Sequence, residues 1–178
     1  SALHHVLGLA DSERMTDPPV KQPRYDLSRM IKFMHHLGDP QRGMRIVHVT
    51  GTKGKGSTSA MIASMLGSCG FKVGLYTSPH LHTMRERIRI NGEPLSEVAF
   101  AEAVGKVWPS VNAIADGDGP ERVTTFETLT GMAFAVFSER MTDFQVLEVG
   151  MGGTLDATNL VEEPMVCVIT SISLDHTA

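Results

Sequence analysis

A glycine-rich turn between a predicted strand and a predicted helix constrains the fold of this chain more than any other feature. Residues 46–50 are mostly β-branched and predict a strand, and residues 51–56 contain three glycines and two lysines. Apolar residues then recur at helical spacing, which predicts a helix beginning near Ser57. This order is typical of a phosphate-binding site, because backbone N–H groups and about half a positive charge of the helix dipole meet at the loop.

The side chains of the turn suit the same role. Lys55 can supply a mobile cation, and Ser57 or Thr58 can place a hydroxyl near a bound metal ion. The turn departs from the standard G-x-x-x-x-G-K-[ST] pattern, because Gly56 precedes Ser57 and Val49 occupies the position of the first glycine. A tight turn without a ligand is the alternative, but it gives no reason for the lysines. We therefore predict phosphate binding.

The composition indicates a soluble globular protein. Hydrophobic residues make up 42% of the chain and charged residues 20%, and the formal charge of −4 gives no electrostatic footprint for nucleic acid or an anionic membrane. No apolar span is long enough to cross a bilayer, and the first residues lack the features of a signal peptide. Cys69 and Cys167 are isolated, which favours buried thiols in a reducing compartment. We expect a cytoplasmic protein without nucleic-acid or membrane partners.

Residues 1–24 predict a short helix and a proline-containing linker, and residues 25–178 predict one α/β unit. Expected strands cover residues 46–50, 71–76, 85–90, 144–149 and 166–170. Expected helices cover residues 27–37, 58–68, 97–107 and 124–137. The apolar stripes of these helices place Ile31 and Val98 among the buried residues. The strand, helix and strand between residues 46 and 76 form a βαβ unit, so its two strands should be parallel.

Polar side chains occur where predicted strands end. Ser78 and His176 each follow a strand, and Glu148 lies near the end of another. The carboxyl ends of parallel strands form the ligand crevice of an α/β sheet. A carboxylate in an apolar strand is costly unless it is paired or binds a metal, so we interpret Glu148 as a Mg²⁺ ligand, with an ion pair as the alternative. Ser78 could instead begin a simple Ser-Pro turn.

Glu127 lies near the start of an otherwise apolar predicted helix. An acidic residue at this position complements the helix dipole. A contact with a substrate is the alternative, and the residues alone leave the choice open.

Five sequence motifs resemble those of one enzyme family. In chain order they are HVTGTKGKGST, YTSPHL, RERIRING, LEVGMGGTLDATN and SISLDHT. From residue 25 to its end the chain resembles folylpolyglutamate synthase/dihydrofolate synthase, of the Mur ligase superfamily. The resemblance implies an α/β fold with a P-loop-type, mostly parallel sheet flanked by helices, as part of an incomplete Mur-ligase-like ATPase domain. It also implies ATP-dependent addition of L-glutamate to a folate or dihydropteroate carboxylate through an acyl phosphate.

The resemblance further implies the site residues. ATP would bind at Gly51, Thr52, Lys53, Gly54, Lys55, Gly56, Ser57 and Thr58. Lys55 would stabilise charge on the transferred phosphoryl group. The Mg²⁺ ligands would be Ser78, Glu148 and His176, and the catalytic residues would be Lys55, Glu148 and His176. The folate or dihydropteroate would contact Leu27, Ser28, Arg29, Thr124, Thr125, Phe126, Glu127, Leu155, Asp156 and Ala157. Phe126 would offer a stacking face to the pterin.

The chain departs from the family pattern in three respects. Lys53 occupies a position that is more often Asn, and Thr154 replaces a frequent Arg, which alters one expected substrate contact. The chain is also much shorter than family members, so we expect an N-terminal fragment that is inactive alone. We expect the full-length protein to be a monomer. The residues do not choose between dihydropteroate and a folate as the substrate.

Three other functions are alternatives. A P-loop kinase or GTPase would carry a strict G-K-[ST] sequence and a D-x-x-G or paired-acid strand, which this chain lacks. A non-catalytic nucleotide-binding fragment is disfavoured, because Lys55, Ser78, Glu148 and His176 are all retained. A ligase for a peptidoglycan precursor would carry G-K-T without the extra glycine.

Overall fold

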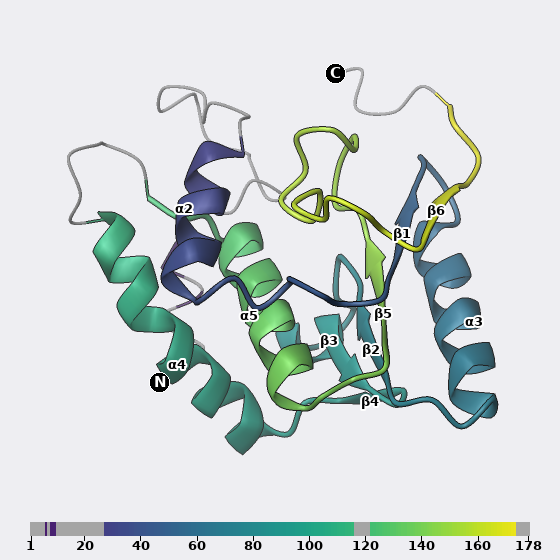
Figure 1. Cartoon of the computed structure of the whole chain (residues 1–178), viewed down its shortest axis with the longest axis horizontal. Helices are drawn as coiled ribbons and strands as arrows, with labels where there is room; N and C mark the ends of the chain where they lie inside the picture. The colour runs from purple at the N-terminus through teal and green to yellow at the C-terminus, as the bar shows by residue number, and fades with distance from the viewer. Residues whose placement is uncertain (1–5, 7, 10–26, 116–121, 174–178) are drawn as a thin grey trace.

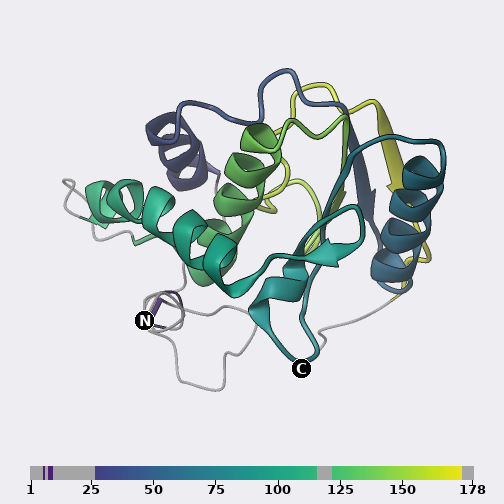
Figure 2. The same cartoon turned by 90° about the horizontal axis from the view of Figure 1, so that it is seen from below.

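A computed structural model describes residues 6, 8–9, 27–115 and 122–173. Most of the helix and linker predicted over residues 1–24 lies outside this part. The described residues form three layers, with a sheet between helix α3 (Lys55–Ser68) on one face and helices α2 (Ser28–His36), α4 (Glu97–Ala115) and α5 (Thr125–Glu139) on the other (Figure 1, Figure 2). Among these residues no helix combines the length and the apolar character needed to span a bilayer.

The sheet of the described part has six strands. They are β1 (Ile46–Thr50), β2 (Val73–Tyr76), β3 (Ile88–Ile90), β4 (Glu93–Pro94), β5 (Phe144–Glu148) and β6 (Val166–Ile169). Their order across the sheet is β4-β3-β2-β5-β1-β6. Strands β2, β5, β1 and β6 are parallel, and β3 and β4 form an antiparallel hairpin at one edge. The predicted P-loop-type, mostly parallel α/β sheet is confirmed. The strands of the βαβ unit are parallel but not adjacent, because β5 lies between them.

Several local predictions were wrong. Cys69 and Cys167, predicted to be buried thiols, are both exposed. Residues 84–87 form a short 3₁₀ helix, η1 (Met84–Arg87), so the predicted strand over 85–90 is reduced to β3. Ile31 and Val98 are exposed. Val98 lies two residues before Phe100, the first buried residue of α4, which turns it about 200° away from the buried stripe. Ile31 follows buried Met30 directly and lies at the flank of the α2 stripe.

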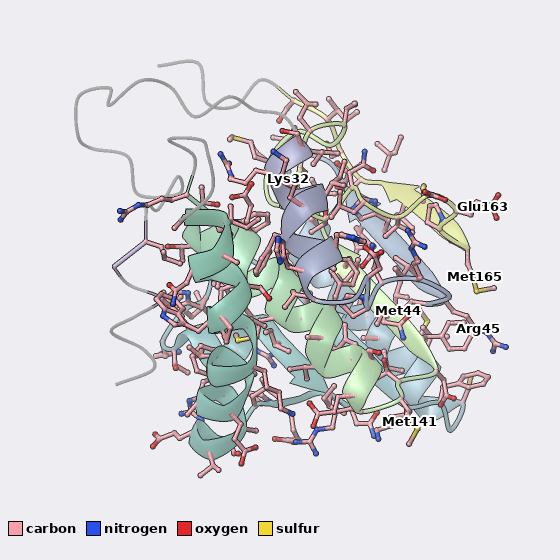
Figure 3. All side chains as sticks on the ribbon, turned by 60° about the vertical axis from the view of Figure 1, so that its left-hand side comes forward. Lys32, Met44, Arg45, Met141, Glu163 and Met165 are labelled. Atoms are coloured by element: carbon pink, nitrogen blue, oxygen red, sulfur yellow. The ribbon has the colours of Figure 1, made fainter. Side chains whose placement is uncertain are left out.

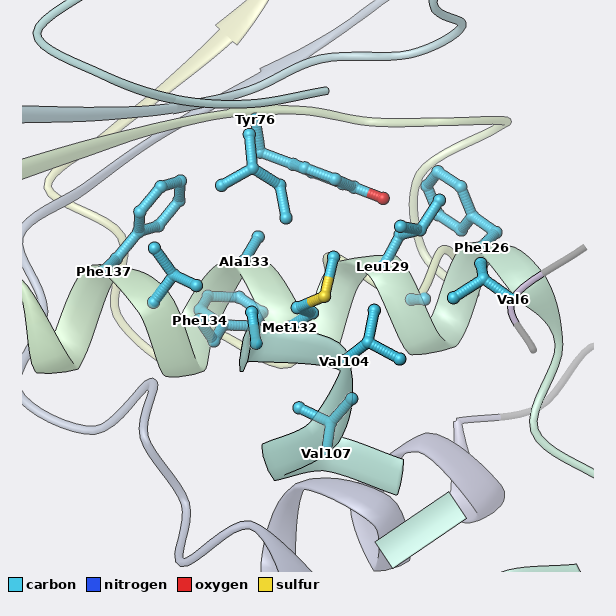
Figure 4. Close-up of a cluster of buried hydrophobic side chains, with 14 of the residues drawn as sticks. Val6, Tyr76, Val104, Val107, Phe126, Leu129, Met132, Ala133, Phe134 and Phe137 are labelled. Atoms are coloured by element: carbon cyan, nitrogen blue, oxygen red, sulfur yellow. The ribbon is translucent and has the colours of Figure 1, made fainter. Parts of the chain in front are cut away.

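Helix α5 lies at the centre of the larger core. Almost every residue from Thr125 to Phe137 is buried, because the sheet covers one side of the helix and α4 the other. Figure 4 shows Tyr76 of β2 over one side of α5, and Val104 and Val107 of α4 on the opposite side. The close approach of α2 depends on Gly131, where a Cβ would stand 2.4 Å from Cε1 of Phe33.

The other face of the sheet is covered by α3 alone. Ile62, Ala63 and Leu66 of this helix pack against a smaller cluster of buried valines and leucine on β1, β2 and β5. Strand β6 lies at the edge beyond this cover, and 66% of Ile169 is exposed. Met165, just before β6, is 59% exposed and projects outward (Figure 3).

Candidate functional site

The predicted phosphate loop is an open helix N-terminus at the end of a buried strand. Strand β1 ends at Thr50, and α3 begins at Lys55 after Gly54, which adopts a left-handed conformation with φ 84°. The N–H of Thr58 donates to the carbonyl of Gly54 at 2.9 Å and closes the first helical turn. The N–H groups before it have no acceptor within the helix, so they and the helix dipole face the loop. The first turn contains no acidic residue. This end of α3 suits an anion.

The loop is anchored to the chain that follows β6. Gly51 has φ 134°, and a Cβ at this position would stand 2.0 Å from Oγ1 of Thr170. The backbone N–H groups of Thr52 and Lys53 donate to the carbonyl of Ser171 at 2.8 and 3.3 Å. These two amides therefore hold the loop in place, and the amides left to face a bound anion would be those of the helix N-terminus.

Lys55 lies over the turn. Its Nζ donates to the carbonyl oxygen of Gly51 at 2.9 Å, so the side chain folds back across the loop that it terminates. A phosphate oxygen bound at the helix N-terminus would offer this ammonium a charged acceptor in place of a carbonyl.

Glu148 lies where the sheet meets the phosphate loop. Its side chain is buried at the end of β5, with the residue 4% exposed, and its Oε2 accepts a hydrogen bond from the backbone N–H of Ser78 at 3.0 Å. Gly56, in the first turn of α3, is so close that a Cβ there would stand 3.4 Å from Oε2. The structure thus brings Ser78, Glu148 and the phosphate loop together. His176 lies outside the described residues, among which no cluster of three His, Cys, Asp or Glu side chains could hold a metal ion.

Two of the predicted substrate segments are joined by a buried ion pair. Arg29 donates through Nε and Nη2 to both carboxylate oxygens of Glu127, at 2.9–3.0 Å, and the two residues are only 8% and 6% exposed. Glu127 also caps its own helix, because its Oε2 accepts from the N–H of Thr124 while Thr124 Oγ1 accepts from the N–H of Glu127. The carboxylate therefore complements the helix N-terminus and fixes α2 to α5, while a direct contact with a substrate stays a prediction.

The third predicted segment is a loop whose shape depends on Asp156. One carboxylate oxygen, Oδ2, accepts from the N–H of Met151 at 2.9 Å. The other, Oδ1, accepts from both the N–H and the hydroxyl of Thr158, at 2.9 and 2.5 Å. The hydroxyl of Thr158 is also 2.8 Å from Nε2 of His48, which lies in β1. Asp156 thus closes the turn from 151 to 158 with backbone and side-chain hydrogen bonds.

This loop meets the start of α5 and the end of β1. A Cβ on Gly150 would stand 2.5 Å from Cζ of Phe126 and 3.1 Å from Oδ2 of Asp156. Thr50 Oγ1 donates to the carbonyl of Gly152 at 3.0 Å. Of the remaining predicted residues, Thr125 and Ala157 are buried, Leu27 is half-buried, and Ser28 and Leu155 are exposed. The predicted substrate segments therefore adjoin one another beside the strand that enters the phosphate loop.

Comparison with known proteins identifies the family. The Mur ligase middle domain family matches residues 49–178. The chain belongs to the Mur ligase family. The dihydrofolate synthase/folylpolyglutamate synthase of Bacillus subtilis is 45% identical over 84% of this chain and 35% of its own length. The human mitochondrial folylpolyglutamate synthase is 44% identical over 76% of the chain and 23% of its own length.

Solved structures of Mur ligase relatives share the fold. An FPGS–AMPPCP–folate complex superposes with a TM-score of 0.87 and 36% identity, covering 99% of this chain and 40% of that one. Mycobacterium tuberculosis folylpolyglutamate synthase complexed with ADP has a TM-score of 0.79 and 39% identity, covering 85% of this chain and 34% of that one. The resemblance inferred from the five motifs is confirmed. The chain spans only part of the length of each of these relatives.

Sequence reasoning missed two buried residues, His48 and Thr158, that link β1 to the loop at residues 150–158. His48 is the only titratable residue in the β-branched strand β1, and this isolation is the signal that could have marked it. Burial lowers the pKa of His48 below its ordinary value, and the negative charge of Asp156 opposes part of that shift. Thr158 had no comparable signal, because a threonine in a polar loop is unremarkable.

Proposed function

We propose that residues 1–178 form the nucleotide-binding part of an ATP-dependent ligase that adds L-glutamate to a folate or dihydropteroate carboxylate through an acyl phosphate. One observation carries the proposal: the buried carboxylate of Glu148 lies against the first turn of α3, where a nucleotide phosphate would bind. The folylpolyglutamate synthase relatives support the reaction and the substrates. We include in the proposal a cytoplasmic location and a monomeric full-length ligase.

The described residues suit phosphoryl transfer by positioning and electrostatics. The N-terminus of α3 would bind the terminal phosphates, and Lys55 would move from its backbone acceptor to the transferred group. Ser78, Glu148 and His176 would hold Mg²⁺, which would neutralise phosphate charge. The hydroxyl and the carboxylate are oxygen donors of the kind that this ion prefers, and the imidazole is the less usual ligand.

The substrate segments suit an aromatic ring system. Phe126 lies against the backbone of Gly150 and 6.0 Å, between ring centroids, from Tyr76. Its ring would offer the pterin a stacking face at a position that the Arg29–Glu127 pair holds in place. The proposal therefore places the pterin beside α5 and the phosphates at α3, with β1 between the two sites.

Removing two charges tests this function in the full-length ligase. Lys55→Ala should lower turnover by about a hundredfold or more, because charge on the transferred group loses its cation. Glu148→Ala should weaken binding of Mg²⁺-ATP, and Glu148→Gln should reproduce the loss, because it keeps the shape and removes the charge. ADP release with glutamate, measured separately with dihydropteroate and with tetrahydrofolate, identifies the substrate.

The control for Lys55→Ala is Lys32→Ala, which removes an exposed lysine of α2 (Figure 3). We expect this variant to release ADP at the wild-type rate. Wild-type rates from Lys55→Ala or Glu148→Ala would overturn the proposed function.

A further inference from the structure

A buried chain of three polar side chains connects strand β1 to the loop at residues 150–158. It consists of His48, Thr158 and Asp156, and we call it the His48 relay. All three residues are buried, with exposed fractions of 8% or less. The loop leaves the carboxyl end of β5 and lies beside β1 (Figure 1). Buried polar groups of this kind stabilise one arrangement of the chain, because leaving any of them without its partner is costly.

The chemistry of the relay fixes the direction of its hydrogen bonds. The carboxylate of Asp156 can only accept, so the Thr158 hydroxyl donates its proton to Oδ1. The Thr158 oxygen must then accept from the imidazole, so His48 carries a proton on Nε2. Burial lowers the pKa of His48, which favours the neutral ring. A neutral imidazole protonated at Nε2 is therefore the form that completes the relay.

The position of His48 in β1 links this loop to the phosphate loop. His48 and Thr50 lie two residues apart and face the same side of the sheet, whereas Val47 and Val49 face α3. Thr50 makes a second attachment, donating to the carbonyl of Gly152 at 3.0 Å. Two side chains of one strand thus hold the loop, and the same strand continues directly into the phosphate loop.

We propose that His48 is a positioning residue that sets the shape of loop 150–158 for the pterin-bearing substrate without contacting that substrate. The proposal rests on the proposed function. Both carboxylate oxygens of Asp156 are bonded to groups of the same loop, so Asp156 acts by fixing the backbone near Gly150 and Phe126. His48 supports Asp156 indirectly, because its hydrogen bond orients the Thr158 hydroxyl toward the carboxylate.

The test compares Michaelis constants in the full-length ligase. His48→Leu removes the donor, and we expect the KM for the folate substrate to rise about tenfold, the size expected for losing one partner of a buried hydrogen bond. The KM for ATP should stay within about twofold, because the N-terminus of α3 is unchanged. His48→Gln restores an N–H near the position of Nε2 and should bring the folate KM back to within about threefold of wild type.

Two further variants keep the test decisive. Thr158→Val removes the same hydrogen bond without altering β1. It should therefore raise the KM for folate and leave the KM for ATP nearly unchanged. It replaces His48→Leu in the test if that variant does not fold. Thr158→Ser keeps the hydroxyl and should behave as wild type. His36→Leu makes the same chemical change at an exposed position of α2 and serves as the control. ¹⁵N NMR of the imidazole should show a proton on Nε2 of His48.

The outcomes separate this proposal from the proposed function. A wild-type ligase without activity on either pterin substrate would overturn the function itself. Two outcomes would overturn the relay alone, provided that the wild-type ligase is active. In the first, His48→Leu and Thr158→Val change the KM for folate and the KM for ATP equally. In the second, they change neither KM. Loss of folate affinity in His48→Gln as large as in His48→Leu, or an imidazole protonated only on Nδ1, would also contradict it.

Discussion

Two glycines of the phosphate loop are needed for different physical reasons. Gly51 has φ 134° and lies against the end of β6, where a Cβ would stand 2.0 Å from Oγ1 of Thr170. The Thr170 hydroxyl is held in that position, because it donates to the carbonyl of Thr50 at 3.1 Å. Gly54 has φ 84° with no atom within 4 Å of its Cβ position, so only its backbone conformation requires glycine. A side chain at position 51 would meet both backbone strain and a steric clash with Thr170, whereas a side chain at position 54 would meet backbone strain alone.

Alanine substitutions should separate the two effects. Gly54→Ala should lower the free energy of unfolding by about 1 kcal/mol, the cost of a left-handed conformation for a residue with a Cβ. Gly51→Ala adds the clash with Thr170 and should cost about 3 kcal/mol or more. Urea unfolding measures both, with Gly67→Ala in the last part of α3 as a control at an open helical position. Equal losses of unfolding free energy in Gly51→Ala and Gly54→Ala would show that Thr170 moves to accommodate the new methyl group.

Single residues of the site could be predicted only where their chemistry conflicts with their surroundings. Glu148 could be found from sequence because a carboxylate in an apolar strand needs a partner. His48 presents a weaker conflict, because a neutral imidazole is satisfied by one hydroxyl. That hydroxyl belongs to Thr158, which is far from His48 in sequence, and no local pattern connects the two. The relay could therefore be recognised only in three dimensions.

At the scale of elements, α5 is tied to its neighbours by two ion pairs of different character. Near its N-terminus, Glu127 pairs with Arg29 of α2 at 2.9 Å, with both side chains 9% exposed. At its C-terminus, Glu139 pairs with Lys106 of α4 at 2.7 Å, with side chains 57% and 53% exposed for Lys106 and Glu139. The shorter distance belongs to the weaker interaction, because water screens the exposed pair.

Removing the positive partner of each pair should reveal this difference. Arg29→Leu leaves the Glu127 carboxylate buried without its partner and should lower the free energy of unfolding by about 3–5 kcal/mol. Lys106→Leu should cost less than about 1 kcal/mol. Denaturant unfolding measures these losses. Adding Glu127→Leu alone and the double variant Arg29→Leu/Glu127→Leu completes a double-mutant cycle that gives the coupling energy of the buried pair. Similar losses for Arg29→Leu and Lys106→Leu would contradict a major role of the buried pair in joining α2 to α5.

The order of helices and strands was predictable, but short elements were not. Residues 85–90 alternate charged and apolar side chains, which predicts a strand. Their first half instead forms η1, because Thr83 and Glu86 build a capping box. The Glu86 carboxylate also accepts from the N–H groups of Leu81 and His82. These bonds together outweigh a two-residue periodicity that extends over only a few positions.

Across the described residues as a whole, the main asymmetry is an edge of the sheet that no described strand covers. Within the described residues no strand pairs with the outer edge of β6. Val166 and Ile169 of this strand are exposed, as is Met165 before it. Parallel strands are normally buried on both faces, and an exposed apolar edge is a site for pairing with another chain.

The chain of residues 1–178 should therefore self-associate as its concentration rises. Ile169→Lys should suppress the association, because a charge at the edge of a sheet opposes pairing, and it should change the free energy of unfolding by less than about 0.5 kcal/mol. Sedimentation velocity measures the association. Val98→Lys places the same charge at an exposed position of α4 and should leave it unchanged. Equal association of wild type and Ile169→Lys would show that β6 is not the contact.

The position of β5 between β1 and β2 has a consequence for how the chain acquires its structure. Strand β5 joins β1 to β2, since Ile46 pairs with Gln145 and Val73 pairs with Phe144. The ribosome therefore synthesises β1, α3 and β2 before the strand that connects them in the sheet. Pairings between such distant segments form slowly, since a long loop must close before they yield any stabilisation. A nascent chain that ends before Phe144 holds the whole phosphate-binding sequence but lacks β5, the strand that joins β1 to β2. We therefore expect the phosphate loop to reach its final shape late, together with the centre of the sheet.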